Sequence, residues 1–255
     1  MMNGMSGSTT GARSGRSTPG PATVRRVVTT RAGGVSRPPY DSFNLGDHVG
    51  DNPAAVAANR RRLADHIGLP PSSMVWMEQI HSRNVTIVRE PTASAVPATD
   101  ALVTTAAGLA LVVLTADCVP VLLSDDEAGV IAAVHAGRVG ARIGIIGEVL
   151  RAMIELGARP DRMGALLGPA ASGARYEVPL PMQRDVEAHL PGSACTTTRN
   201  TPGLDIRAGV HRQLLDAGVG AVAVDPRCTI ADSSLFSHRG GAPTGRLASV
   251  IWMEG

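Results

Sequence analysis

The sequence contains no lysine, and all 24 of its basic residues are arginine. A Schiff-base enzyme needs a lysine amine, and a Walker A loop needs a lysine on the phosphates, so both chemistries are excluded. Any anionic ligand must therefore be held by arginine or by backbone amides. The formal net charge is +2, and the arginines are spread along the chain instead of gathering in a block.

Aromatic residues are also scarce, at 2% of the chain. Proteins that bind nucleic acid usually combine a basic stripe with stacking aromatic side chains, so we expect no nucleic-acid partner. The apolar content of 44% is enough for a hydrophobic core, which must be built from alanine, valine, leucine and isoleucine. No apolar run approaches the ~18 residues of a membrane span, so no membrane association is expected.

The cysteines at positions 118, 195 and 228 are odd in number and widely spaced. This pattern is not that of a secreted disulfide framework, and the N-terminus lacks the apolar segment of a signal peptide. We therefore expect a cytoplasmic protein, and we take it to be a monomer.

Residues 1–24 are rich in Gly, Ser, Thr, Pro and Arg, and we predict a disordered tail followed by one domain over residues 25–255. Apolar runs at 119–123 and 129–134, separated by a short turn, predict a β-hairpin. Helices are expected at residues 53–66, 138–156, 181–190 and 205–217. Because hairpins and helices are mixed instead of strictly alternating, the pattern favours an α/β (α+β) fold, a single compact domain with mixed β-sheets packed by helices.

His81, Cys118 and His135 each stand where an apolar, strand-like run meets a turn. One thiolate and two imidazoles are the ligand set of an open zinc site, which keeps a fourth position for water or substrate. Each residue alone has an ordinary interpretation, as a core thiol, a turn histidine or a helix cap, and their spacing matches no zinc finger. Together they favour a metal site. Asp117 beside Cys118 is a further catalytic candidate, since a carboxylate between buried strands needs a metal-bound imidazole, an arginine or backbone amides as partner.

Candidates for substrate binding are polar residues in or beside turns and loops. They are Arg31, Asn44, Gln79, Arg138, Tyr176 and Arg246. Arg31 and Arg246 stand in glycine-containing loops, where a backbone can close on a ligand. Among the remaining histidines, His48 is expected on the surface and His238 is intermediate. Cys195 and Cys228 are expected to be structural.

Several ordered runs resemble the YfiH family, also called the laccase-domain or polyphenol-oxidase family, the LACC-type purine nucleoside phosphorylases and the peptidoglycan editing factors. The runs are TTRAGGVS, FNLGDHVGD, WMEQIHS, LTADCVPVLL, AAVHAGR, GPAASGARYEV and FSHRGGAPTGR, and the resemblance covers about residues 24–255. It implies a compact α/β fold with mixed sheets and a metal held by His81, Cys118 and His135.

The resemblance also implies activity on small molecules. Members phosphorolyse adenosine, inosine and S-methyl-5'-thioadenosine to the base and a ribose 1-phosphate, and deaminate adenosine to inosine. Others are linked to removing wrongly incorporated residues from cell-wall precursors, and an older label describes copper-dependent phenol oxidases. One departure is that many members carry HAGWRG, whereas this chain reads HAGRVG from His135. The substrate contacts of the Trp-Arg pair stay open, and Arg138 is the candidate to supply the positive charge.

The first functional hypothesis is a zinc-dependent purine nucleoside enzyme. Zinc would activate water for attack at the purine C6, and Asp117 would orient a metal ligand or move the proton. Arg31, Arg138 and Arg246 would hold the phosphate for phosphorolysis.

Two alternatives stay open. In a Cys–His hydrolase, Cys118 would be the nucleophile and His81 or His135 its base. In a binding protein, the metal would be structural. Copper is the less favoured metal, because a four-copper oxidase needs H-x-H pairs that the seven histidines do not form, and no methionine is evidently placed as the axial ligand of a type-1 site.

Overall fold

The computed structural model describes residues 22–255, so the predicted tail of residues 1–24 lies almost entirely outside the described residues. The strands are β1 (Val24–Val28), β2 (Met74–Val75), β3 (Val85–Ile87), β4 (Ala101–Thr104), β5 (Ala110–Thr115), β6 (Val119–Asp125), β7 (Val130–Ala136), β8 (Gly164–Leu167), β9 (Ala194–Thr196), β10 (Pro202–Leu204), β11 (Ala221–Val224) and β12 (Leu247–Met253). The helices are α1 (Pro53–Ile67), α2 (Arg138–Arg142), α3 (Ile145–Glu155), α4 (Leu180–His189) and α5 (Ile206–Asp216), with short 3-10 turns at Pro71–Ser73 and Pro160–Arg162.

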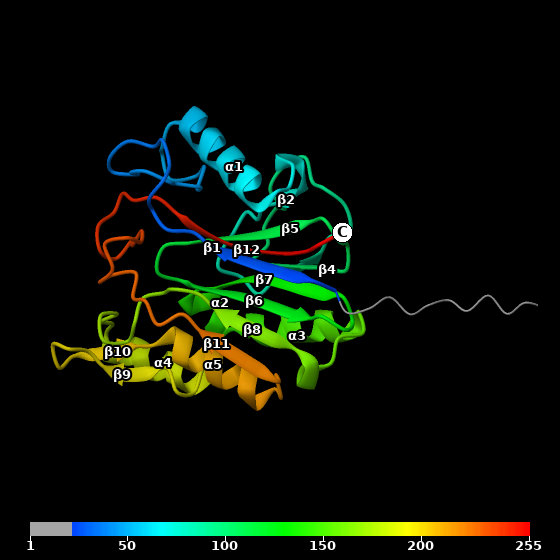
Figure 1. Cartoon of the computed structure of the whole chain (residues 1–255). Helices are drawn as coiled ribbons and strands as arrows, with labels where there is room; N and C mark the ends of the chain where they lie inside the picture. The colour runs from blue at the N-terminus through cyan, green and yellow to red at the C-terminus, as the bar shows by residue number, and fades with distance from the viewer. Residues whose placement is uncertain (1–21) are drawn as a thin grey trace, which may run out of the picture.

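Two sheets stack face to face and helices cover their outer faces (Figure 1). One sheet has the strand order β1-β12-β5-β2 and the other β11-β8-β6-β7-β4-β3. Both mix parallel and antiparallel pairs, so the predicted mixed-sheet α/β fold is confirmed. A small β9–β10 hairpin stands apart. None of the helices within residues 22–255 combines the length and apolar character that crossing a bilayer requires.

The strand sequences are apolar on both faces because both faces are covered. In β5, Ala110, Val112 and Leu114 pack toward α1, whereas Leu111 and Val113 pack between the two sheets. Strands buried on both sides lose the alternation of polar and apolar residues and become continuous apolar runs. This is why the run LALVVL predicts a core strand.

The predicted helix over residues 138–156 is wrong as one element. The structure has α2 and α3 in its place, and Gly144 between them adopts a φ of 95°. This left-handed conformation suits glycine and ends the first helix. The break lets the short α2 pack against β7 next to His135 while α3 runs along the six-stranded sheet.

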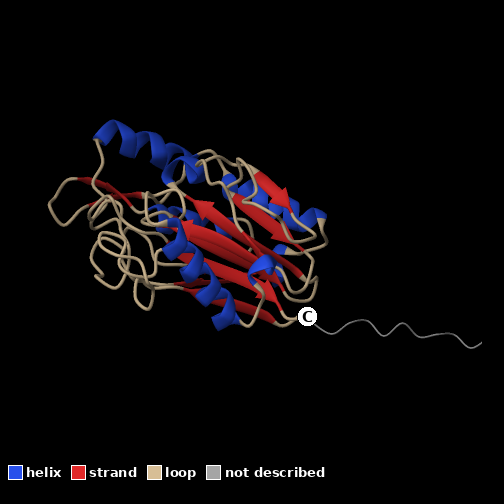
Figure 2. Cartoon of the chain, turned by 90° about the horizontal axis from the view of Figure 1, so that it is seen from above, coloured by secondary structure: helices blue, strands red, loops and turns tan. Residues whose placement is uncertain are grey.

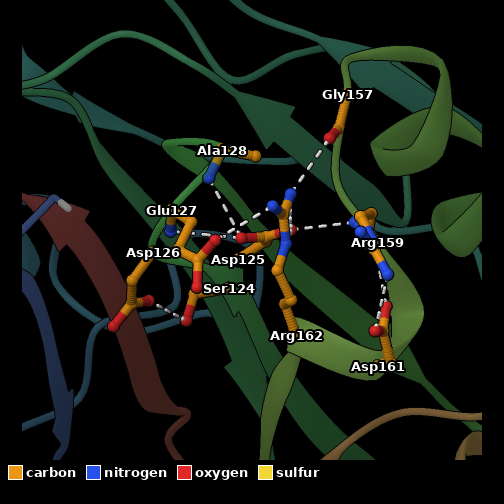
Figure 3. A network of polar contacts seen from close by, with 9 residues as sticks. All are labelled: Ser124, Asp125, Asp126, Glu127, Ala128, Gly157, Arg159, Asp161 and Arg162. Carbon is orange, nitrogen blue, oxygen red and sulfur yellow. Dashed lines mark hydrogen bonds and ion pairs between the residues drawn. The ribbon is translucent and has the colours of Figure 1, made fainter. Parts of the chain in front are cut away.

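The β6–β7 hairpin is closed by a buried carboxylate at its turn (Figure 3). Asp125 accepts hydrogen bonds from the backbone N–H groups of Glu127 (3.1 Å), Ala128 (3.0 Å) and Arg159 (2.8 Å). The Arg162 guanidinium adds two bonds, of 3.1 Å from Nε and 2.9 Å from Nη2. Burial raises the pKa of this carboxyl, but the amides of Ala128 and Arg159 and the Arg162 charge lower it overall. The network joins the turn to the connection between α3 and β8.

At the opposite end of this hairpin, loops gather beyond the ends of the strands (Figure 2). Among them are the segment before α1 and the segment between β11 and β12, which are far apart in the sequence (Figure 1). The functional candidates lie at this end.

Candidate functional site

The β6–β7 register brings Cys118 and His135 together. Val119 at the start of β6 lies opposite Ala136 at the end of β7, and Pro120 lies opposite His135. His81 arrives on the loop after β2, with a left-handed φ of 60°. The His81 and His135 ring centroids are 4.7 Å apart at an interplanar angle of 72°, and the Cys118 Sγ lies 3.8 Å from His81 Nε2.

These three side chains fit a metal ion. Their donor atoms lie within 4.8 Å of one another, and within residues 22–255 they form the one such group of three. Tetrahedral zinc bound to one sulfur and one nitrogen holds those two atoms about 3.6 Å apart, given typical bond lengths. The observed 3.8 Å between Cys118 and His81 agrees with that geometry. One thiolate and two imidazoles leave a fourth position open, as in catalytic zinc sites.

A buried aspartate that the sequence arguments did not select fixes both histidines. The Oδ1 atom of Asp100 accepts hydrogen bonds from His135 Nδ1 (2.8 Å) and the His81 N–H (3.0 Å). Its Oδ2 atom accepts from the Ser82 N–H and hydroxyl (2.7 Å each) and from the Ile80 N–H (3.2 Å). A carboxylate on Nδ1 leaves His135 Nε2 free to bind metal and orients the ring, as is usual for metal-ligating histidines.

Asp117 does not occupy that orienting position. Its carboxylate accepts hydrogen bonds from Thr229 Oγ1 (2.6 Å), Ser237 Oγ (2.7 Å) and the Arg239 N–H (2.7 Å). No hydrogen bond joins it to either histidine ligand in the described part of the chain. Asp117 is half-buried, and of the partners expected for it a backbone amide is present, with two hydroxyl groups completing the set.

Charge within the site is strongly coupled. Burial opposes ionisation of the Cys118 thiol, but His135 and His81 lower its pKa to about 6. Burial disfavours a charged His135, yet Cys118 and Asp100 raise its pKa to about 9. The pKa of Asp100 falls to about 2, because the bonds from His135 and Ser82 outweigh the opposing effect of burial. In the metal-free protein these shifts favour a thiolate beside an imidazolium, and metal binding would then release a proton.

The ligand group lines a pocket of about 410 Å³. Of the predicted substrate-binding residues, Gln79, Arg138, Tyr176 and Arg246 line it. Asp117 does so as well, together with His48, His238 and Arg239. His48 is exposed, as expected, and lies at the pocket's lining, whereas Arg239 had no signal in the sequence beyond its place beside His238.

Arg31 and Asn44 lie outside the pocket, contrary to expectation. The Arg31 guanidinium donates to the Asp41 carbonyl (2.8 Å) and stacks over the Phe236 ring, 5.0 Å from its centroid. Asn44 is fully buried, and its Oδ1 accepts from the Arg246 N–H at 2.8 Å. Asn44 therefore holds the backbone of Arg246, the arginine that does reach the pocket.

Several pocket residues already contact other groups of the protein through their polar side chains. The Gln79 amide donates to the Leu114 carbonyl and accepts from the Leu114 N–H, at 2.8 Å each, which ties the His81 loop to β5. Arg246 Nη1 donates to two carbonyls of its own loop, at 3.1 Å each. Burial lowers the pKa of Arg246, opposed by Cys118 and other acidic groups. The Tyr176 ring lies under the Arg239 guanidinium, 4.8 Å from its centroid.

Gly137 leaves room for the ligands. A Cβ at this position would lie 2.8 Å from His81 Cδ2 and 3.1 Å from the Cys118 Sγ. The glycine has an ordinary φ of −73°, so its value here is space and not backbone freedom. The side chains that approach this glycine closely are those of His81 and Cys118.

Comparison with known proteins fits these findings. A family described as "Multi-copper polyphenol oxidoreductase laccase" matches residues 25–254. The chain belongs to this family. It is 65% identical over 232 residues to a purine nucleoside phosphorylase of Corynebacterium glutamicum, covering 90% of this chain and 94% of that protein. It is 60% identical over 231 residues to a purine nucleoside phosphorylase of Mycobacterium tuberculosis, covering 91% and 92%.

Solved structures confirm both the fold and the resemblance to YfiH proteins. The Bacillus licheniformis protein YfiH matches with a TM-score of 0.85 at 30% identity, covering 91% of this chain and 93% of that one. YlmD from Geobacillus stearothermophilus matches with a TM-score of 0.84 at 33% identity, covering 91% and 92%. The family description refers to several copper ions, whereas residues 22–255 gather one Cys–His–His group.

Proposed function

We propose that the protein is a zinc-dependent purine nucleoside enzyme. It phosphorolyses adenosine, inosine and S-methyl-5'-thioadenosine to the base and a ribose 1-phosphate, and it deaminates adenosine to inosine. The observation that carries the proposal is the His81–Cys118–His135 group in the wall of a pocket that also receives Arg138 and Arg246. The names of the relatives from Corynebacterium and Mycobacterium support the phosphorolysis.

The chain's residues divide into three tasks. His81, Cys118 and His135 would hold the zinc, which when bound supplies a Lewis acid that lowers the pKa of a coordinated water. Asp100 orients the His135 ring and holds the backbone of His81. Arg138 and Arg246 place positive charge in the pocket, where phosphate needs charged donors.

The pocket would favour both reactions by position and charge. In phosphorolysis, phosphate attacks the ribose C1′, and arginines that hold the phosphate reduce the entropy cost of bringing it to the nucleoside. In deamination, water attacks the purine C6, the bond from C6 to its amino group breaks, and ammonia leaves. We further propose that one domain, residues 25–255, carries this activity as a cytoplasmic monomer, which gel filtration of the purified protein would test for its oligomeric state.

Product analysis tests the proposal directly. Wild type and Cys118→Ala are incubated with adenosine, with and without phosphate, and the products are separated. Inosine reports deamination, and adenine that forms only with phosphate reports phosphorolysis. Cys195→Ala is the matched control, because Cys195 lies outside the pocket-lining set and should leave both zinc content and turnover intact. Equal product from wild type and Cys118→Ala would refute the assignment.

One observation favours a second candidate, a Cys–His hydrolase acting on cell-wall precursors. The Cys118 Sγ lies 3.8 Å from His81 Nε2, and its pKa of about 6 would leave a thiolate at neutral pH. Metal content separates the two. About one zinc per chain, with activity lost to a chelator, supports the nucleoside enzyme. Activity that resists the chelator but is abolished by thiol alkylation supports the hydrolase.

A further inference from the structure

Residues 229–241, here called the wall segment, separate two cavities. On one side His238 and Arg239 line the metal-site pocket. On the other side the segment borders a second cavity, also of about 410 Å³, which Thr229 and Ser237 line. The buried apolar side chains of the wall segment are those of Leu235 and Phe236, which pack in a small cluster with Leu247. Because the segment borders a cavity on each side, its polar contacts help to set its position between them.

Backbone hydrogen bonds join Thr229 to the Ala170 carbonyl (3.1 Å) and Arg31 to the Ser234 carbonyl (2.9 Å), and three further contacts of the segment converge on Asp117. Both of its carboxylate oxygens are used: Oδ1 accepts from the Thr229 and Ser237 hydroxyls, and Oδ2 accepts from the Arg239 N–H. The Ser237 hydroxyl also accepts from the Gly240 N–H at 2.8 Å, which closes the turn of the segment. All three partners of the carboxylate belong to the wall segment, although they are 112 to 122 residues away in the sequence.

The wall continues beyond the segment itself. Arg239 donates from Nη1 to the Glu177 carbonyl (3.3 Å), and its guanidinium covers the Tyr176 ring. The Asp117 carbonyl in turn accepts from the Ala171 N–H at 2.9 Å. Asp117 therefore connects the loop that carries Cys118 with the wall segment and with Ala171, which also lines the pocket.

We propose that Asp117 is a positioning residue that latches the wall segment, and that it sets how tightly the pocket holds the nucleoside through His238 and Arg239. This rests on the proposed function, since it takes the pocket to be the nucleoside site. Three donors of the wall segment occupy three of the roughly four acceptor sites of this carboxylate, so the geometry suits it to hold the wall.

Two variants separate the latch from proton transfer. Thr229→Val with Ser237→Ala removes both hydroxyl donors and leaves Asp117 in place. We expect the KM for adenosine to rise about tenfold while kcat stays within about threefold. The two lost hydrogen bonds to Asp117 fix the wall that binds the nucleoside and take no part in the chemical step. Asp117→Asn keeps the latch, since its amide can donate to both hydroxyls while its oxygen accepts from the Arg239 N–H.

We expect Asp117→Asn to raise the KM only about threefold and to keep kcat within about threefold. The proposal is overturned if Asp117→Asn lowers kcat by about 100-fold or more, as the loss of a general acid or base would, while the double variant leaves the KM unchanged. Ser234→Ala is the control. It removes a hydroxyl of the same segment that bonds Asp232 and not Asp117, so its KM should match wild type.

Hydrogen exchange tests the latch without any turnover. In the double variant the amides of residues 229–241, that of Arg239 above all, should exchange at least about tenfold faster, while the zinc content stays at the wild-type level. If wild type turned over no nucleoside, the proposed function would fail, yet faster exchange would still support the latch. Unchanged exchange in the double variant would sink the latch even in an active enzyme.

Discussion

Asp100→Asn is the substitution that most directly tests how the candidate metal ligands are held. Asp100 is fully buried and accepts from donors on both oxygens. An asparagine of the same size must place an NH2 group where one oxygen was. In one orientation this group faces the Ser82 N–H, which lies 2.7 Å from Oδ2 in the wild type. In the other it faces the His81 N–H and His135 Nδ1.

The expected cost follows from these contacts. A buried donor left without its acceptor costs about 1–3 kcal/mol, so we expect the free energy of unfolding of the metal-free protein to fall by about 2–4 kcal/mol. For a chain of this size that lowers the Tm by roughly 5–15 °C. If the amide drives His135 to the tautomer protonated on Nε2, that nitrogen can no longer bind metal. Loss of such an orienting partner typically weakens metal binding by about 10–100-fold.

Two measurements check this. Zinc affinity is measured by competition with a chromogenic chelator, and Tm is measured by thermal unfolding with and without chelator. Asp232→Asn is the control, since Asp232 accepts hydrogen bonds from Ser234 within its own loop. Its zinc affinity should equal that of wild type. A wild-type zinc Kd in Asp100→Asn would refute the reasoning that this carboxylate fixes the tautomer.

Three further substitutions probe packing and charge. Gly137→Ala should reduce zinc affinity at least about tenfold, because the new Cβ would lie 2.8 Å from a carbon of the His81 ring; Gly147→Ala, with nothing within 4 Å, should leave zinc affinity unchanged. Thr115→Val should raise the free energy of unfolding by about 1 kcal/mol in urea titrations, since Thr115 Oγ1 is buried and has no partner within residues 22–255, and a decrease would show that the hydroxyl is satisfied. Asp125→Asn should destabilise the protein most near neutral pH. The lowered pKa of Asp125 gives stability that is present above the pKa of the unfolded chain, near ~4, and is lost as the pH falls through the pKa of the folded protein. The difference in free energy of unfolding between wild type and variant should therefore narrow at pH ~3 and not widen.

The candidate metal ligands could be grouped from the sequence because each lies at or beyond the end of a buried strand. The apolar runs before Cys118 and His135 become β5 and β7, and a hairpin with a short turn must bring the end of β7 beside the start of β6. His81 is harder, since its loop reaches the site through a parallel contact of β2 with β5. The resemblance to the YfiH family supplied that step.

Asp100 escaped prediction because its role depends on strand register. The residue precedes β4, and its partner His135 is 35 positions later. The two meet because Ala101 lies opposite Val134 across β4 and β7. No local pattern in the sequence encodes that pairing. A carboxylate beside buried strands needs partners, and this holds for Asp100 as much as for Asp117.

The two glycine-loop arginines show the same limit. Arg246 precedes β12, and β12 pairs with β5. Because the end of β5 lies at the site, Arg246 lines the pocket. Arg31 follows β1, which lies on the far side of β12 in the sheet order β1-β12-β5-β2. The local sequences of Arg31 and Arg246 lead to the same prediction for both residues. They differ in the place of the neighbouring strand, because β12 lies beside β5 in the sheet and β1 does not.

The sequence by itself determined the chemistry available to this protein. It excluded lysine chemistry, supplied one thiol and two imidazoles at strand ends, and set a core of strands covered on both faces. Only the tertiary structure decided which polar groups serve that chemistry. It placed Asp100 behind the histidines and turned Asp117 toward the wall segment. The physical reason is that apolar patterning is local and specifies strands, whereas partners for buried polar groups come from register and sheet order, which join residues far apart in the chain.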